Sequence, residues 1–280
     1  MKTVKGSIDV GRFRVPYRMY GESPRYLLCV SGALQTMVVW RSFVKKFSDH
    51  YTCITFDMPG TGRSEILSGP AKVEVQEQLE VLAGLVEEAT DGKPVALAGS
   101  SWGTVIAAGY AAIYPDKVER LLLGSFALKP NDTMLEVTQR AKALYESGDW
   151  AKGADLIIEV FGTQIAGTYK KKIGAQFKGL SPTNAEAFYE HCMNIATTSR
   201  LEDFLDLSQI SAHTLIINGA DDTIIDLDDM HVAAKQIPNC ETILVENAGH
   251  FLHFEQPGLL ELYAEFMVPE ELKPAKVKIA

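Results

Sequence analysis

Short apolar runs of strand length alternate along this chain with longer segments of helical periodicity. Buried strands are predicted for residues 26–30, 51–56, 94–98, 118–124, 214–218 and 242–246. Helices are predicted between them, at residues 38–47, 73–89, 104–114, 227–236 and 255–266. Together with a hairpin-like start, this order predicts an α/β fold with a mostly parallel sheet of eight strands and helices on both faces.

The strand pattern is absent from residues 126–206, where only helical periodicity occurs. Four helices are predicted there, at residues 133–146, 150–161, 168–177 and 184–197. We expect this segment to form a helical cap inserted over the sheet. The predicted divisions are a first part of the core (1–125), the cap (126–206), a second part of the core (207–268) and a loosely held tail (269–280).

Composition and charge narrow the class of protein. Apolar residues make up 46% and charged residues 22% of the 280 positions, which is ordinary for a globular protein. The net charge of −9 argues against a nucleic-acid surface, which needs a basic stripe. Residues 1–10 lack the apolar region of a signal peptide, and no apolar run approaches the about 18 residues that span a bilayer. We therefore expect a cytoplasmic protein without a membrane span, and the sequence leaves a homodimer open.

The cysteines add no binding chemistry. They number four and form no C-x-x-C pair, and two of them lie in apolar strand-like runs: Cys29, Cys53, Cys192 and Cys240. This pattern is typical of reduced thiols and has no metal-ligand spacing, so no metal site is predicted.

The stretch Gly99-Ser100-Ser101-Trp102-Gly103 stands between a predicted strand and a predicted helix. A G-x-S-x-G pattern at such a turn is a nucleophile elbow, with Ser101 as the nucleophile. Glycines on both sides allow the tight turn, because side chains there would collide with neighbouring backbone. The alternative is a turn of glycine and serine without a catalytic role.

Two further groups follow later strands, at the edge where sites of open parallel sheets form. His250 follows the last strand and is the expected general base, since its pKa suits neutral pH. An acid is expected to fix the imidazole tautomer, and Asp222 is the preferred residue, with Asp221 and Asp226 as competitors. The alternative for His250 is a loop histidine of structural role.

A tetrahedral oxyanion needs two N–H donors at about 3 Å. We expect these donors from Trp102, which follows the nucleophile, and from Ala33, in the loop after the strand at 26–30. Gly32 lets that loop approach closely, although a tight turn alone would also use a glycine.

Apolar cap residues are candidates for an acyl pocket, although core packing is the alternative for each one. Leu34, Met134 and Phe161 are the predicted substrate-binding residues. The further candidates share a bulky apolar side chain in the predicted cap: Leu135, Leu144, Trp150, Ile157, Phe188 and Met193.

Over residues 24–267 the chain resembles the α/β-hydrolase superfamily. The matching pieces are short motifs at the strand ends: Ser31-Gly32, Asp57 to Ser64, the elbow, Gly219 to Asp222, and Gly249-His250 with Glu255-Gln256-Pro257 behind it. The resemblance implies an α/β-hydrolase fold with a cap, no cofactor and no metal. Most relatives have His-Gly before the oxyanion residue, whereas this chain has Ser31-Gly32.

A narrower resemblance is to bacterial hydroxyacyl transferases, which move 3-hydroxyacyl chains from acyl carrier protein. It is carried by three segments: Ser31 to Leu34, Ser100 to Gly103, and the cap opening at Ser125 to Leu128 and Arg140 to Leu144. The Ser-Trp-Gly elbow is also similar to proline iminopeptidases, whose Gly-rich oxyanion segment is absent. Dehalogenases and epoxide hydrolases carry Asp at the nucleophile, which Ser101 argues against.

The sequence therefore predicts a serine carboxylesterase that acts on small-molecule esters of short or medium acyl chains. The alternative with the same triad is an acyltransferase of the acyl carrier protein or CoA type. A basic rim at the pocket would favour a carrier, and Lys170-Lys171-Lys172 could contribute to it, unless it is only a solvated helix face. A third class is a ligand receptor that keeps the fold.

Overall fold

The computed structural model describes residues 1–162, 165 and 167–272. The strands of this part are β1 (Thr3–Val10), β2 (Phe13–Tyr20), β3 (Tyr26–Val30), β4 (Thr52–Phe56), β5 (Glu65–Ile66), β6 (Val95–Ser100), β7 (Val118–Gly124), β8 (His213–Gly219) and β9 (Cys240–Val245). Eight of them form the path β1-β2-β4-β3-β6-β7-β8-β9, as predicted. The ninth, β5, pairs with β2 and was not predicted, because two residues are too short for a hydrophobic pattern.

The sheet is mostly parallel, as the sequence predicts. β1 and β2 form an antiparallel hairpin, and β2 also runs antiparallel to β4. From β4 onward every pair along the path to β9 is parallel. All five residues of β4 are buried, as expected for a strand covered by helices on both faces. The carboxyl ends of the parallel strands therefore lie at one edge of the sheet.

The helices are α1 (Arg41–Phe47), α2 (Val75–Thr90), α3 (Trp102–Ile113), α4 (Asp132–Glu146), α5 (Gly153–Phe161), α6 (Gly167–Lys178), α7 (Pro182–Thr197), α8 (Asp228–Gln236), α9 (Leu252–Glu255) and α10 (Leu259–Met267). Short 3-10 turns occupy Met37–Trp40, Pro115–Lys117, Trp150–Lys152, Leu201–Asp203, Leu207–Gln209 and Glu270–Leu272. Apolar residues of α2, α3 and α8 pack in one core cluster, and those of α1 and α10 pack in a second. These clusters cover the two faces of the sheet, which confirms the predicted layers.

The closing helix differs from the prediction. A single helix over residues 255–266 is expected from the apolar periodicity, but the structure has α9 and α10 with a break between them. Pro257 causes the break, since it cannot donate a main-chain hydrogen bond and forces the preceding residue out of helical geometry. Gln256 accordingly has φ −125° and ψ 85°.

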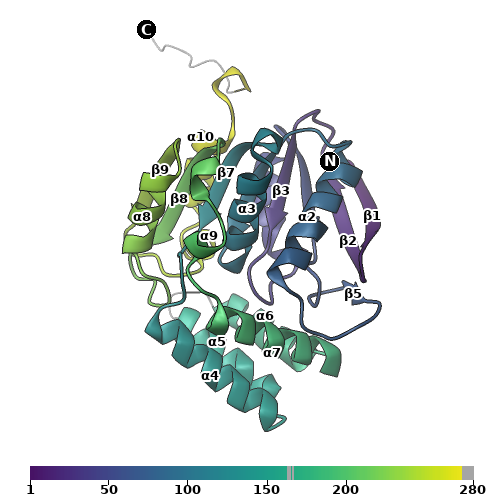
Figure 1. The fold of residues 1–280 in the computed structure, drawn as a ribbon, viewed down its shortest axis with the longest axis vertical. Helices are drawn as coiled ribbons and strands as arrows, with labels where there is room; N and C mark the ends of the chain where they lie inside the picture. The colour runs from purple at the N-terminus through teal and green to yellow at the C-terminus, as the bar shows by residue number, and fades with distance from the viewer. Residues whose placement is uncertain (163–164, 166, 273–280) are drawn as a thin grey trace.

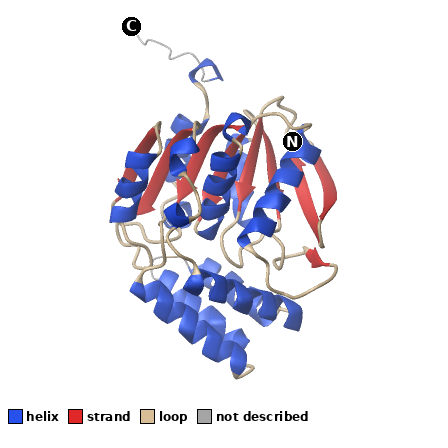
Figure 2. Cartoon of the chain, in the orientation of Figure 1, coloured by secondary structure: helices blue, strands red, loops and turns tan. Residues whose placement is uncertain are grey.

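Helices α4–α7, called the cap helices below, lie between β7 and β8 in the chain. Figure 1 shows them as a separate layer across one end of the sheet, and Figure 2 shows that this layer consists of helices and loops. Asn131 begins α4 by accepting a hydrogen bond from the main-chain N–H of Met134 at 2.9 Å. No helix within the described ranges has the length and apolar character to cross a membrane. Residues 273–280 of the predicted tail lie outside the described residues.

Asp229 on α8 joins both ends of the cap to the core. Its carboxylate accepts a hydrogen bond from the N–H of Leu128, before α4, at 2.9 Å. It also lies 3.6 Å from the guanidinium of Arg200, after α7. Because Leu201 N–H donates to the Leu128 carbonyl at 2.8 Å, the two connections of the cap are held side by side.

Candidate active site

Ser101 lies on the sharp turn between β6 and α3, with φ 52° and ψ −125°. A non-glycine residue adopts such backbone angles only when its surroundings impose them. The two flanking glycines make the turn possible. A Cβ at Gly99 would lie 2.8 Å from the carbonyl oxygen of Gly103, and a Cβ at Gly103 would collide with the carbonyl of Val30. The backbone at Ser101 thus has the geometry that the elbow motif predicts.

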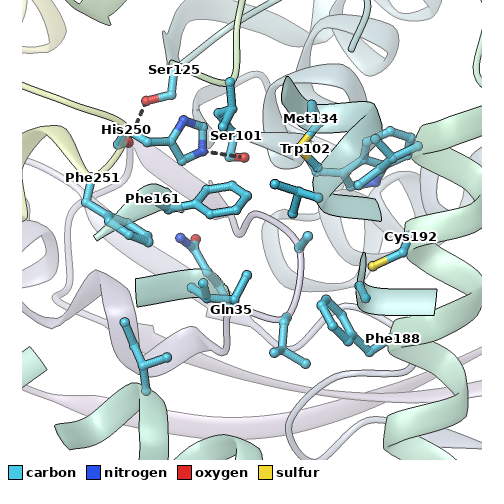
Figure 3. Close-up of a pocket in the computed structure, with 18 of the residues that line it drawn as sticks. Gln35, Ser101, Trp102, Ser125, Met134, Phe161, Phe188, Cys192, His250 and Phe251 are labelled. Atoms are coloured by element: carbon cyan, nitrogen blue, oxygen red, sulfur yellow. Dashed lines mark hydrogen bonds between the residues drawn. The ribbon is translucent and has the colours of Figure 1, made fainter. Parts of the chain in front are cut away.

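A chain of two hydrogen bonds joins Ser101, His250 and Asp222. His250 Nε2 lies 2.9 Å from Ser101 Oγ, and His250 Nδ1 lies 2.7 Å from Asp222 Oδ2. The carboxylate can only accept, so Nδ1 carries the proton and Nε2 is left to accept from the serine hydroxyl. The side chains of His250 and Asp222 are 5% and 1% exposed, so little water competes for these bonds. Figure 3 shows the serine and the imidazole side by side at the cavity wall.

The structure brings Asp222, rather than either competing carboxylate, to His250. Asp226 accepts a hydrogen bond from the N–H of Asp228 at 3.1 Å, at the beginning of α8. The loops after β8 and β9 approach closely at Gly219, where a Cβ would collide with main-chain carbonyls of the His250 loop. This approach places Asp222 against the imidazole.

Two residues that the sequence analysis did not assign to the site hold the His250 main chain. Ser125, at φ 57°, donates its hydroxyl to the His250 carbonyl at 2.7 Å (Figure 3). The Glu255 carboxylate accepts from the N–H groups of Gly249 at 2.5 Å and of Phe251 at 3.2 Å. The available signal for Ser125 was its position directly after the buried strand β7. Glu255 was noted only as part of a family motif.

The predicted oxyanion donors flank the nucleophile. A Cβ on Gly32 would lie 3.0 Å from Ser101 Cβ, so the Gly32–Ala33 loop passes directly beside the serine. The main-chain N–H of Trp102 is at the N-terminus of α3, where helix N–H groups lack partners. In the described part of the chain, neither this N–H nor that of Ala33 has a hydrogen-bond acceptor. Both groups are therefore available to a bound oxygen.

Other side chains order this loop in place of the imidazole that the family pattern would supply. Ser31 Oγ accepts a hydrogen bond from the indole Nε1 of Trp40 at 2.9 Å. Gln35 Oε1 accepts from the N–H of Gly32 at 3.0 Å, and Gln176 Nε2 donates to the carbonyl of Leu34 at 2.5 Å. Although Ser31 replaces the histidine of the family pattern, three side-chain hydrogen bonds thus hold the loop.

A cavity of about 600 Å³ opens between Ser101 and the cap helices. Leu34, Met134 and Phe161, the predicted substrate-binding residues, all line it. The Phe161 ring meets the His250 ring edge-on, with centroids 5.4 Å apart. Four further predicted candidates line the cavity, and two do not. The four are Leu144, Trp150, Ile157 and Phe188; the two are Leu135 and Met193. Most of the lining is apolar, which suits an apolar acyl chain.

Cys192 is a second nucleophile type in the cavity lining. Burial raises the pKa of its thiol to about 12, so the thiol stays protonated at neutral pH. Within the described residues, no group of three or more His, Cys, Asp or Glu side chains is arranged to hold a metal ion. Ser101, in contrast, lies within hydrogen-bond distance of an imidazole.

A sequence model of the alpha/beta hydrolase family matches residues 27–261. This chain belongs to that family. It is 28% identical over 255 residues to human monoacylglycerol lipase ABHD6, covering 85% of this chain and 73% of the lipase. It is 20% identical over 252 residues to the (R)-3-hydroxydecanoyl-ACP:CoA transacylase of Pseudomonas putida, covering 88% of this chain and 84% of that protein.

Solved structures of this family share the fold with the chain. A thermophilic esterase from Thermogutta terrifontis superposes with a TM-score of 0.78 at 20% identity, covering 94% of this chain and 97% of the esterase. At this identity the likeness concerns the fold alone. Family membership therefore establishes the fold and leaves the chemistry to be argued from the site.

Proposed function

We propose that this protein is a serine hydrolase that cleaves carboxylic esters of short to medium acyl chains. One observation carries the proposal: the hydrogen-bonded chain from Asp222 through His250 to Ser101 opens into an apolar cavity. An apolar cavity holds the acyl chain, and the serine at its wall meets the carbonyl carbon. The hydrolase names among the relatives support the reaction class.

In the first half of the reaction, Ser101 Oγ attacks the ester carbonyl carbon while its proton moves to His250 Nε2. The carbonyl electron pair moves to oxygen, and the N–H groups of Ala33 and Trp102 stabilise that oxyanion. The intermediate then collapses, the bond to the alcohol oxygen breaks, and the alcohol leaves with the proton from His250. Asp222 stabilises the imidazolium whenever His250 carries the extra proton.

In the second half, water attacks the acyl-enzyme and gives a proton to His250 Nε2. The bond between Ser101 Oγ and the acyl carbon breaks, and Oγ takes the proton back from His250. The products are the carboxylic acid and free enzyme, so atoms and charges balance. No cofactor or metal takes part in either half.

Release of p-nitrophenol from butyrate and octanoate esters tests this proposal. Wild-type protein and Ser100→Ala, the adjacent serine, are expected to turn over both esters. Ser101→Ala is expected to lose at least about 1,000-fold in kcat, because the nucleophile is absent. Equal turnover by Ser101→Ala would contradict the role of Ser101 as the nucleophile. No turnover by the wild type would contradict ester hydrolysis and favour the receptor alternative.

Acyl transfer is the second candidate, and the charge of the cavity lining favours it. Four cations line the cavity and are exposed: Arg41, Lys45, Lys129 and Lys172. No Asp or Glu occurs among the lining residues of the described chain, although the net charge is −9. None of the four cations has an ion pair in that part, and Lys172 lies over the Tyr169 ring at 5.0 Å. Such a rim suits a phosphate-bearing or acidic acyl carrier.

A product analysis distinguishes transfer from hydrolysis. The protein is incubated with a 3-hydroxydecanoyl thioester of acyl carrier protein and with CoA, and free acid and acyl-CoA are quantified. Transfer predicts acyl-CoA as the main product and a rise in KM for Lys172→Ala. Lys171→Ala is the matched control, because Lys171 is exposed on the same helix but does not line the cavity. Free acid as the main product, with equal KM in both variants, would favour the esterase.

A further inference from the structure

One face of α4 lines the cavity along nearly the whole helix. The lining residues recur at spacings of three and four positions, as the residues on one side of a helix do: Met134, Val137, Thr138, Ala141, Leu144 and Tyr145. From Met134 to Tyr145 the chain advances eleven positions of about 1.5 Å each, which gives about 16 Å along the helix axis. The cavity is therefore elongated in the direction of α4.

The beginning of α4 is tied to the triad. Asn131 precedes the helix and donates its Nδ2 group to the carbonyls of Thr223 at 3.0 Å and Ile225 at 3.2 Å. Thr223 directly follows Asp222, the residue bonded to His250. The other end of α4 lies at the side of the cap that is farthest from the sheet (Figure 1). The cavity thus runs along α4 from the triad toward the outer end of the cap.

Three aromatic side chains gather at this outer end. The ring of Tyr145 stacks on that of Tyr189 from α7, with centroids 4.5 Å apart and planes at 16°. The ring of Trp150 is 6.4 Å from the Tyr145 ring. All three residues line the cavity and are partly exposed, so they stand between the cavity and solvent. A stacked pair of rings supplied by two helices forms an end wall.

The charged residues of the lining lie elsewhere. In α4 and α7, all of whose residues the structure describes, no charged residue lines the cavity. Arg41 and Lys45 belong to α1 and Lys172 to α6, whereas Lys129 precedes α4 at the end near the triad. Because apolar chains are buried favourably against apolar walls, this division assigns the acyl chain to the α4 and α7 side.

We propose that the acyl chain of the substrate lies along α4, and that the stacked rings of Tyr145 and Tyr189 set its greatest length. The inference rests on the proposed function and specifies its acyl class. An extended carbon chain advances about 1.2 Å per bond, a third of the span of an extended residue with its three main-chain bonds. About 16 Å then accommodates about 13 bonds, so a dodecanoyl chain fits and a hexadecanoyl chain meets the rings.

Substitutions can move this limit in both directions. Tyr145→Ala and Tyr189→Ala remove one ring each and are expected to admit longer chains, whereas Tyr189→Phe keeps the ring and the limit. Ala141→Phe places a ring seven positions after Met134, or about 10 Å along the axis, and is expected to admit octanoyl but not dodecanoyl chains.

Leu135→Ala and Met193→Ala are the matched controls. Each shortens an apolar, partly exposed side chain on α4 or α7, but neither residue lines the cavity. Turnover of the butyrate ester by each variant verifies that the triad is intact, because butyrate is too short to reach the rings. Thermal melting verifies that each variant is folded.

The measurement is kcat/KM for p-nitrophenyl butyrate, octanoate, dodecanoate and hexadecanoate at one detergent concentration. Wild type is expected to prefer dodecanoate to hexadecanoate at least about tenfold, and each Tyr→Ala variant to lose most of that preference. Ala141→Phe should lower the ratio of dodecanoate to butyrate at least about tenfold. Tyr189→Phe and both controls should keep the wild-type ratios within about threefold.

The outcomes distinguish this inference from the proposed function. Turnover of butyrate by every variant, with length ratios unchanged in Tyr145→Ala, Tyr189→Ala and Ala141→Phe, would overturn the length limit and leave the serine hydrolase intact. Equal kcat/KM of wild type for dodecanoate and hexadecanoate would also overturn the limit. No turnover of any ester by the wild type would overturn both proposals.

Discussion

Replacing Asp222 by Asn changes one atom beside His250 and leaves the packing nearly unaltered. Asp222 Oδ1 accepts a hydrogen bond from the N–H of Ile224 at 3.2 Å, whereas Oδ2 accepts from His250 Nδ1 at 2.7 Å. An asparagine keeps the first bond only with its oxygen toward Ile224. Its NH2 group then faces His250 Nδ1, which must become an acceptor and shift its proton to Nε2. The imidazole can no longer take the proton of Ser101.

The expected loss of kcat follows from that change of the His250 tautomer. Loss of the acid's effect on a triad histidine typically lowers kcat by about 10⁴-fold, which corresponds to about 5 kcal/mol of transition-state stabilisation. The side chain of Asp222 is 1% exposed, so water does not replace the lost carboxylate. KM is expected to change little, because Asp222 does not line the cavity.

Steady-state hydrolysis of p-nitrophenyl octanoate measures the effect, with Asp221→Asn and Asp226→Asn as matched controls. Each control removes the same charge from the same loop and is expected to keep kcat within about fivefold. Thermal melting shows whether each variant folds. The reasoning is refuted if Asp222→Asn stays within tenfold of wild type, or if one of the controls loses more activity than Asp222→Asn.

Three further predictions follow from the packing around the site. Glu255→Ala removes the acceptor of the N–H groups on both sides of His250, so the imidazole should be held less firmly. We expect kcat to fall about tenfold or more, measured by single-turnover kinetics with Ser101 intact; an unchanged kcat contradicts this. Gly103→Ala forces a methyl group into the main chain at the end of β3, and urea unfolding should show a loss of about 1–3 kcal/mol. Gly258→Ala is the control, because Gly258 is exposed, has φ −60° and leaves open space for a methyl group. Burial lowers the pKa of His191 and His253 to about 4. Because the unfolded chain binds these protons at about pH 6.5, stability is full above pH 6.5 and falls toward pH 4, by up to about 1.4 kcal/mol per unit for each histidine. His253→Phe should make urea midpoints less sensitive to pH in that window, and an equal slope would contradict the prediction.

The amino-acid pattern was sufficient to predict the layers of the fold and the three residues that the structure joins by hydrogen bonds at the candidate site. The apolar runs indicate strands that are buried on both faces, and the helices each have one apolar stripe. A parallel sheet between two layers of helices buries both kinds of surface. Ser101, Asp222 and His250 could be predicted because each follows a strand, and the carboxyl ends of parallel strands meet at one edge. The role of the elbow glycines could also be predicted from the local sequence, because only residues without a side chain permit that turn.

Contacts between segments far apart in the chain could not be predicted from the sequence and were found only in the folded molecule. The preference for Asp222 over Asp221 and Asp226 depends on the close approach of two loops at Gly219, which no local pattern encodes. Ser125 reaches the His250 carbonyl across the sheet, and Gln35 Oε1 accepts a hydrogen bond from the N–H of Gly32. Cationic side chains of α1 and α6 line one cavity only after the cap helices are placed over the sheet. Hydrophobic periodicity specifies which face of an element is buried, but hydrogen bonds between loops depend on positions of a few tenths of an ångström that only the assembled core fixes.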